Sequence, residues 1–292
     1  MKVTVRVPGG SLSADQLAFY NREGYLMIPG LLDAADLAPA REAMEFRVEG
    51  IAQDLLREGL ISDPLANAPF ETRLARLFEN LSDSIFLRYD RSWRDRLPGY
   101  FHLMANPKIL DMVESLLGPE IFANPVYNTR PKVPKVAAGI VPWHQDKSYW
   151  TGAKAAPVIT VWIPLVDATL ENGCLHVLPG THRRKVLGFH AETYSGTGYK
   201  EVDEQHVRDR LKDDLALPIQ AGGAILFNDR FIHSSTANNS NQVRWSLDLR
   251  YQPVDQDPMP QYGAGFLARS RAHPERVATL EDWLASRPEH TA

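Results

Sequence analysis

Two histidines and one aspartate stand out in this chain because their side chains could together hold a metal ion. His144 and Asp146 lie in the run Val141-Pro-Trp-His-Gln-Asp-Lys-Ser-Tyr-Trp150, and His233 lies far along the chain in a second strand-like run. Two imidazoles and one carboxylate suit one face of an octahedral Fe(II) ion and leave the opposite face open. Substrate and oxygen could approach the metal through that open face.

Arg244 is the second residue whose type and position could do chemistry. It follows His233 in the run Val243-Arg-Trp-Ser-Leu-Asp-Leu-Arg-Tyr251. If this strand lies beside the metal, the guanidinium offers a planar fork that matches a carboxylate. A metal with open positions and a carboxylate clamp together favour an oxygenase that uses a 2-oxo acid. The ordinary alternative is a salt-bridged residue, because Arg244 alternates with Trp245 along the strand.

The elements that must position these residues are mainly helices in the first hundred-odd residues. Ser13-Ala-Asp-Gln16 has the form of a capping box, which predicts a helix that stops at Gly24. A short strand is predicted over 25–28, and a helix that starts at Asp33 or Asp36 is predicted to run to about residue 56. Residues 106–118 have a proline near the start and a glycine at the end, as helices often do.

From about residue 120 the pattern changes to short strands separated by turns. The clearest strands cover residues 157–166, 173–179, 222–227 and 243–251. Turns with Gly, Asn and Pro separate them, which is typical of a β-sandwich or a jelly roll. The stretch 181–217 is long, charged and rich in Gly and Tyr, and connections of that length are often lids.

Several segments, taken in order, resemble the phytanoyl-CoA dioxygenase family of Fe(II)/2-oxoglutarate oxygenases. That family also includes ectoine hydroxylase and many natural-product tailoring enzymes. The resemblance begins at residues 17–32 and continues through Trp143-His-Gln-Asp146, residues 162–165 and residues 171–182. It closes with His233-Ser-Ser and Arg244. A His-x-Asp tripeptide alone is common, whereas all these segments with this spacing are specific.

The resemblance implies a fold that is mainly β with packed α-helices, a double-stranded β-helix (jelly roll, cupin-like). We expect a single Fe(II)/2-oxoglutarate dioxygenase domain over residues 1–292. Its expected parts are a helical N-terminal part over about 1–118, a jelly-roll core over about 120–254 and a lid-like insert over about 181–217. The insert is expected to control access to the site.

The resemblance also assigns roles residue by residue. His144, Asp146 and His233 match the family's metal ligands and catalytic residues. Arg244 matches the residue that pairs with the distal carboxylate of 2-oxoglutarate, and Ser235 matches the hydroxyl that assists it. The further cosubstrate positions are Gln145, Trp162, Trp150 and Arg130.

Three of these further positions have alternatives. Trp150 and Trp162 could equally be core aromatics. Departures from the family pattern in Asn128-Thr-Arg-Pro-Lys132 leave Arg130, Asn128 and Lys132 all open.

The implied cofactor is Fe(II), with 2-oxoglutarate and O2 as cosubstrates and succinate and CO2 as products. Related halogenases have Gly or Ala where this chain has Asp146, which opens a site for chloride. A carboxylate there favours hydroxylation, desaturation or ring formation, and the sequence leaves these three open.

The expected activity is oxidation of an unactivated C–H bond of a small organic molecule, with secondary metabolism as the first choice. An acyl-CoA 2-hydroxylase of phytanoyl-CoA type is the second, for which Arg183-Arg184-Lys185 would offer a basic patch. A metal-dependent binding protein without turnover is a further class. A cupin-like isomerase or epimerase is another, and it would not need Arg244.

Composition restricts the expected partners and location. The chain has 292 residues, 44% of them hydrophobic, which is enough for one large domain with a filled core. A net charge of −4 without blocks of like charge predicts no nucleic-acid or membrane-surface partner. Residues 1–7 are followed by no apolar signal-peptide region, and no run approaches the roughly 18 apolar residues of a membrane span. Cys174 is the single cysteine, so we expect no intrachain disulfide and a cytoplasmic location.

Overall fold

The computed structural model describes residues 11–90, 96–150, 157–192, 197–256, 263 and 265–286. The N-terminal stretch 1–7 and residues 193–196 of the lid-like insert lie outside the described residues. The helices are α1 (Ala14–Glu23), α2 (Ala34–Arg57), α3 (Arg73–Phe78), α4 (Asp83–Asp90), α5 (Pro98–Met104), α6 (Pro107–Leu117), α7 (Glu204–Val207) and α8 (Leu280–Ala285). The strands are β1 (Tyr25–Ile28), β2 (Ile121–Ala123), β3 (Asn128–Lys132), β4 (Val141–His144), β5 (Ile159–Pro164), β6 (Leu175–Val177), β7 (Phe189–Ala191), β8 (Lys200–Val202), β9 (Leu215–Leu217), β10 (Ala224–Asn228), β11 (His233–Ser235), β12 (Arg244–Pro253) and β13 (Phe266–Arg269).

The predicted capping box at the start of α1 is confirmed. The Gln16 amide donates to Ser13 Oγ at 3.2 Å, and the Ser13 amide donates to Gln16 Oε1 at 2.8 Å. These reciprocal bonds satisfy two amide groups that a helix start leaves unpaired. The helix ends at Gly24, whose φ of 87° lies in the left-handed region that glycine adopts readily. Strand β1 follows at once, as the sequence predicts.

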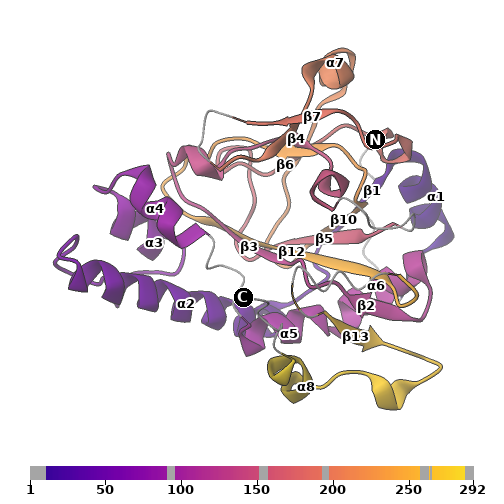
Figure 1. Ribbon diagram of the computed structural model, residues 1–292, viewed down its shortest axis with the longest axis horizontal. Helices are drawn as coiled ribbons and strands as arrows, with labels where there is room; N and C mark the ends of the chain where they lie inside the picture. Colours follow the sequence, from indigo (N-terminus) through magenta and orange to yellow (C-terminus); the bar gives the residue numbers. More distant parts are fainter. Residues whose placement is uncertain are drawn as a thin grey trace, which may run out of the picture.

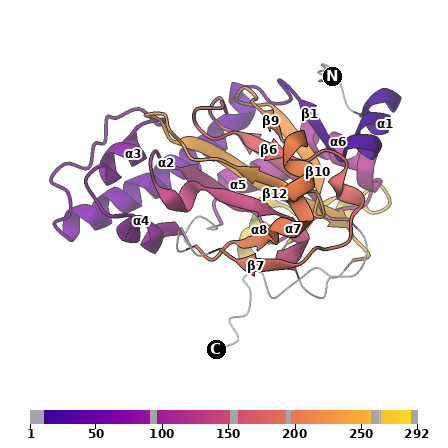
Figure 2. The same cartoon turned by 90° about the horizontal axis from the view of Figure 1, so that it is seen from above.

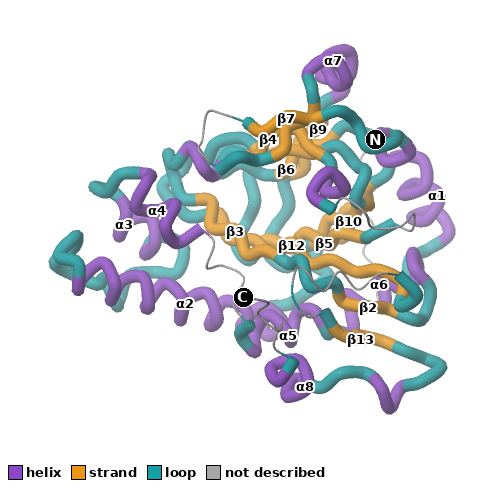
Figure 3. Tube along the Cα trace, viewed as in Figure 1, coloured by secondary structure: helices purple, strands orange, loops and turns teal. Residues whose placement is uncertain are grey.

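Two antiparallel sheets face each other and form the body of the molecule. The larger sheet has the order β1-β10-β5-β12-β2-β13, and β3 also pairs with β12. The smaller sheet has the order β4-β11-β6-β9. Figure 3 shows the two layers of strands, with helices below the larger sheet. The chain passes from the smaller sheet at β4 to the larger sheet at β5 and back to the smaller sheet at β6. The successive strands β9, β10, β11 and β12 then alternate between the two sheets in the same way. The predicted jelly roll is therefore confirmed.

The helices cover the outer face and the ends of the larger sheet. Helices α2 and α5 run beneath this sheet, on the side away from the smaller one (Figure 1). Helices α3 and α4 lie at one end of the sheets and α1 and α6 at the other, as Figure 2 shows from above. Among the described residues, none of the helices combines the length and the apolar character that crossing a bilayer requires.

Strand β12 separates an apolar layer from a polar one. Its side chains alternate between the two faces of the sheet, because successive residues of a strand point to opposite sides. One set is buried against the helical layer, where Trp245 Nε1 donates to the Phe70 carbonyl at 3.2 Å and Tyr251 Oη to the Met104 carbonyl at 3.0 Å. The other set faces the smaller sheet and consists of Arg244, Ser246, Asp248 and Arg250. The face of the larger sheet that borders the space between the sheets is therefore polar and charged along β12.

The stretch 181–217 contains more structure than a loop. Strands β7 and β8 pair as a hairpin, with Phe189 opposite Val202, and α7 follows them. Strand β9, at the end of the stretch, pairs with β6 and belongs to the smaller sheet. The hairpin and α7 lie on the outer side of this sheet (Figure 1). Control of access by this insert stays a prediction.

Candidate active site

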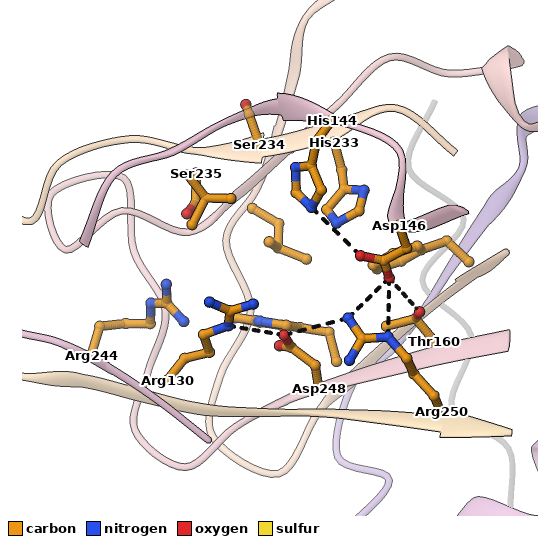
Figure 4. Close-up of a pocket in the computed structure, with 14 residues that line it drawn as sticks. Arg130, His144, Asp146, Thr160, His233, Ser234, Ser235, Arg244, Asp248 and Arg250 are labelled. Carbon is orange, nitrogen blue, oxygen red and sulfur yellow. Dashed lines mark hydrogen bonds and ion pairs between the residues drawn. The ribbon is translucent and has the colours of Figure 1, made fainter. Parts of the chain in front are cut away.

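The three predicted metal ligands meet between the two sheets. His144 ends β4 and His233 begins β11, and their Cα atoms are partners in the antiparallel register. Asp146 follows β4 at the start of the short 3₁₀ helix Asp146–Tyr149. The two imidazole centroids are 4.1 Å apart, and His144 Nε2 lies 3.6 Å from Asp146 Oδ1. One ligand atom from each residue lies within 4.8 Å of the others, so the three could hold a metal ion (Figure 4).

Both histidines are oriented to present Nε2 to that ion. His144 Nδ1 lies 2.9 Å from the Pro142 carbonyl, and His233 Nδ1 lies 3.0 Å from the Phe231 carbonyl. A carbonyl oxygen can only accept, so each Nδ1 carries the hydrogen and each Nε2 keeps its lone pair. Burial lowers the pKa of His233 to about 3, and the neighbouring His144 acts in the same direction. The His233 ring is therefore neutral at neutral pH, the form that binds a metal.

Asp146 is oriented by a second set of bonds. Its Oδ2 accepts from Thr160 Oγ1 at 2.9 Å and from Arg250 Nη2 at 3.1 Å, which leaves Oδ1 on the side of the imidazoles. Burial alone would raise the pKa of Asp146, but the charge of Arg250 holds it well below its usual value. The carboxylate is therefore ionised. One anionic oxygen and two imidazole nitrogens suit a divalent iron ion.

Replacement of Thr160 by valine is expected to weaken metal binding. The exchange preserves shape but removes one hydrogen bond to Asp146 Oδ2, so the carboxylate is held less firmly. Loss of such a supporting bond typically weakens metal affinity about 10- to 100-fold. Anaerobic competition with a chromophoric Fe(II) chelator measures this, and Thr160→Ser, which keeps the hydroxyl, should bind iron like the parent protein. Equal iron affinity in Thr160→Val would contradict the proposed support.

Arg244 and Ser235 line the same pocket as the triad. Arg244 is 3% exposed, its Nη1 donates to Ser246 Oγ, and its guanidinium carbon lies 5.3 Å from the centre of the Trp162 ring. Its Nε has no hydrogen-bond partner within the described part of the chain. Burial lowers the pKa of Arg244 to about 10, so the side chain still carries its charge at neutral pH. This arrangement fits a carboxylate clamp, a role that stays a proposal.

Trp162 and Arg130 also line this pocket. Arg130 Nε donates to Asp248 Oδ2 at 3.1 Å, and its Nη1 donates to the Tyr199 hydroxyl at 3.0 Å. Tyr199 directly precedes β8, so the β7–β8 hairpin reaches the pocket through this contact. A contact of Arg130 or Trp162 with the cosubstrate stays a prediction.

Gln145 and Trp150 are placed differently, because neither lies among the described residues that line the pocket. Gln145 alternates with His144 and Asp146, and its amide donates to the Arg230 carbonyl at 2.6 Å and accepts from the Leu187 amide at 2.9 Å. Trp150 packs in a small apolar cluster, with the Arg250 guanidinium 5.4 Å from its ring centre. Their cosubstrate contacts stay predictions, and the geometry gives Gln145 a task in holding the segment around Leu187.

Thr160 and Arg250 also support the triad and are not among the site residues predicted from the sequence. Arg250 could have been placed with Arg244, because polar and apolar residues alternate along β12. Thr160 had no such signal, since β5 is buried along its whole length and reads as a continuous apolar run. Its place beside Asp146 follows from the long-range meeting of the two sheets.

The fold and the site together define a class of protein, the mononuclear non-haem iron oxygenases built on a double-stranded β-helix. The profile of the family described as "Phytanoyl-CoA dioxygenase (PhyH)" matches residues 20–246. The chain therefore belongs to the phytanoyl-CoA dioxygenase family and is an Fe(II)- and 2-oxoglutarate-dependent dioxygenase.

Individual relatives share about a quarter of their residues with the chain. It is 24% identical to human peroxisomal phytanoyl-CoA dioxygenase, over 84% of this chain and 69% of the relative. It is 26% identical to the L-proline trans-4-hydroxylase of Streptomyces griseoviridis, over 87% of this chain and 92% of the relative. The crystal structure of SnoK, a non-haem α-ketoglutarate-dependent carbocyclase of nogalamycin biosynthesis, superposes with a TM-score of 0.51 at 22% identity, covering 84% and 85% of the two chains. This last likeness shows the fold.

Proposed function

We propose that this enzyme oxidises an unactivated C–H bond of a small organic molecule in the biosynthesis of a secondary metabolite. Hydroxylation is the simplest outcome, and desaturation and ring formation use the same ligand set. The observation that carries the proposal is the pairing, within one pocket, of the His144–Asp146–His233 triad with the buried, partly unpaired guanidinium of Arg244. A 2-oxo dicarboxylic acid can reach a metal at the triad with its 2-oxo acid group and Arg244 with its second carboxylate at the same time.

The metal ligands and the proposed carboxylate clamp come from different sheets. The smaller sheet provides the triad, and the larger sheet provides Arg244 to hold the distal carboxylate of 2-oxoglutarate and so set its angle of approach. Iron bound to the triad supplies the redox chemistry that couples O2 reduction to oxidative decarboxylation of 2-oxoglutarate. In hydroxylation, one oxygen atom of O2 enters the product and the other enters succinate, with release of CO2. Asp146 occupies the position that related halogenases leave open for chloride. Its carboxylate therefore favours hydroxylation, desaturation or ring formation over halogenation.

The walls of the pocket are partly polar and partly apolar, which supports a small organic substrate. Beyond the triad and Arg244, the lining includes the ion pair of Arg130 and Asp248, which Tyr199 contacts from the hairpin. Apolar lining comes from Val141, Leu175 and Phe227. The L-proline trans-4-hydroxylase, a relative whose name specifies a small substrate, and the fold neighbour SnoK support this choice.

An acyl-CoA 2-hydroxylase is the alternative, and the similarity to human phytanoyl-CoA dioxygenase favours it. The basic patch that would serve the phosphates is partly engaged within the chain. Arg183 donates to the Asn21 carbonyl, and Arg184 donates to the His206 carbonyl at 3.1 Å. These guanidinium groups therefore already have backbone partners, which supports a small molecule over a CoA thioester.

The test is substrate-dependent formation of succinate by the Fe(II)-loaded enzyme with 2-oxoglutarate and isotopically labelled O2. We expect a small cyclic amino acid or a hydroxylated ring compound to raise succinate formation and to yield labelled product in equal amount, while acyl-CoA thioesters do neither. Stimulation by acyl-CoA thioesters alone would establish the alternative instead. A folded, iron-loaded protein that neither binds nor decarboxylates 2-oxoglutarate would overturn the oxygenase proposal in favour of a binding protein.

A further inference from the structure

Lys147 and Asp229 form a buried ion pair next to the proposed metal ligands. Lys147 directly follows Asp146, and Asp229 comes just after β10, four residues before His233. Lys147 is 9% exposed and Asp229 is 1% exposed, and Lys147 Nζ lies 3.3 Å from Asp229 Oδ2. Neither residue is among the described residues that line the catalytic pocket. The pair therefore needs an explanation other than contact with substrate or cosubstrate.

The strand pairing that joins the two histidine ligands ends before Asp146. Strand β4 ends at His144, and its pairing with β11 sets His144 opposite His233. Asp146 lies beyond that end, at the start of the short 3₁₀ helix. The β4–β11 ladder therefore fixes the two histidines relative to each other but does not extend to the carboxylate ligand.

Other bonds attach the segment around Asp146 to the loop between β10 and β11. On one side of Asp146, the Lys147 amide donates to the Asp229 carbonyl at 2.7 Å. On the other side, the Gln145 side-chain amide donates to the Arg230 carbonyl at 2.6 Å. The loop that leads to the second histidine ligand is thus bonded to both neighbours of the aspartate ligand.

The ion pair adds a link between side chains to this backbone link. Neither Lys147 Nζ nor Asp229 Oδ2 makes a hydrogen bond within the described part of the chain, so each of these atoms depends on the charge of the other. A buried charge that loses its partner is costly, because it is cut off from water. Loss of either charge would therefore drive the remaining one towards water and pull the two segments apart.

We propose, on the basis of the function proposed above, that Lys147 and Asp229 are positioning residues for the metal site. Their ion pair fixes the place of Asp146 relative to His233 beyond the end of the β4–β11 ladder. It acts through the backbone of the two segments, since neither side chain lines the pocket. A metal site needs its ligands held in place by the groups behind them, so a small shift of the Asp146 segment weakens metal binding.

The test measures metal affinity and ligand geometry in folded variants. In Lys147→Met, which removes the charge and keeps an unbranched side chain, the Kd for Fe(II) should rise about 10- to 100-fold in anaerobic competition with a chromophoric chelator. Visible absorption of the Co(II)-substituted protein reports the arrangement of the ligands, and its bands should shift. Asp229→Asn, an exchange of nearly equal size, should have both effects and provides the answer if Lys147→Met folds poorly.

Arg73→Met is the matched control. Arg73 is also 9% exposed, and it pairs with Glu49 between α3 and α2 in the helical part of the molecule. This variant loses a buried cation as Lys147→Met does, so its resistance to urea should fall. Its Kd for Fe(II) and its Co(II) bands should stay those of the parent protein.

A double variant shows whether the two residues act together. Lys147→Met/Asp229→Asn should bind Fe(II) about as weakly as either single variant, since both exchanges break the same ion pair. Losses of affinity that add up in the double variant would mean that the residues act separately, and this would overturn the proposal.

An ion pair that only stabilises the fold gives a different pattern. Lys147→Met and Asp229→Asn would then lower the resistance to urea as Arg73→Met does, with an unchanged Kd for Fe(II) and unchanged Co(II) bands, and the positioning role would be wrong. A parent protein that does not bind Fe(II) would instead overturn the proposed function on which this role rests.

Discussion

Replacement of Asp146 by alanine is expected to abolish 2-oxoglutarate turnover and high-affinity iron binding. The exchange removes the anionic ligand of the triad and leaves two imidazoles, of which His233 is neutral. Loss of one member of a catalytic unit commonly lowers turnover on the order of 10³-fold or more. Succinate formation and anaerobic iron titration measure the two effects separately.

The same exchange is expected to destabilise the protein, for a reason separate from the metal. Arg250 is 5% exposed and its two bonds to Asp146 Oδ2 disappear, so a buried charge loses its main partner. Breaking a buried ion pair in this way costs roughly 3–5 kcal/mol, and Asp248, 3.8 Å from Arg250, moderates the loss. The double variant Asp146→Ala/Arg250→Met lacks the unpaired charge of Arg250. Its resistance to urea should therefore return towards that of the parent protein, while turnover stays absent.

His176 provides a matched control for the triad. It lies on β6 opposite Ser234, the residue next to His233, but its Nδ1 contacts Asp214 at 2.9 Å. His176→Ala should therefore keep iron binding, whereas His233→Ala should lose it. Iron binding that survives in both Asp146→Ala and His233→Ala would rule out the triad as the metal site.

The metal ligands could be predicted from the sequence because their chemistry is local. His144 ends β4 and Asp146 lies two residues on, after the extended Gln145, so their side chains share one face. Gln145 lies between them and must point away, as its bonds to Arg230 and Leu187 show. The same alternation explains why Arg244 reaches the pocket while Trp245 packs against the helices.

The supporting residues could not be predicted because they depend on pairing between distant strands. Lys132 meets Ser235, and Thr160 meets Asp146, only because the larger and smaller sheets face each other at a particular offset. No local pattern in 128–132 or 159–164 encodes that offset. The fold class was predictable from short strands and turns, whereas the hairpin within 181–217 was not, since its strands are only three residues long.

The site holds its charges in two different ways. Asp146 is paired in the metal-free protein, since Arg250 balances it, and so the ligand oxygen is ionised before iron binds. Arg244 and Lys132 are not balanced by any carboxylate of the described chain at ion-pair distance. The anion that completes this end is therefore expected to come from the cosubstrate. Removal of the charge at Asp146 should consequently destabilise the metal-free protein, whereas removal of the charge at Arg244 should not.

Arg244→Met is expected to weaken 2-oxoglutarate binding about 100-fold or more without unfolding the protein. Two charge-assisted hydrogen bonds to a carboxylate contribute roughly 1.5–3 kcal/mol each, and every 1.4 kcal/mol corresponds to about tenfold in affinity. The loss should appear mainly as a higher KM for 2-oxoglutarate, with a smaller change in kcat at saturation, because the triad on the other sheet is untouched. The metal-free protein should keep its urea resistance, since the exchange removes a buried charge that has no counter-ion.

Comparison with other arginine exchanges gives this prediction its specificity. Arg244→Lys should recover only part of the affinity, because a point charge lacks the planar fork. Arg269→Met is a matched control on β13 of the same sheet, where the guanidinium pairs with Asp111 and Glu114, and it should leave the KM unchanged. Full turnover in Arg244→Met would mean that no carboxylate is held there. The cupin-like isomerase or epimerase class, which needs no clamp, would then explain the site better than a 2-oxoglutarate oxygenase.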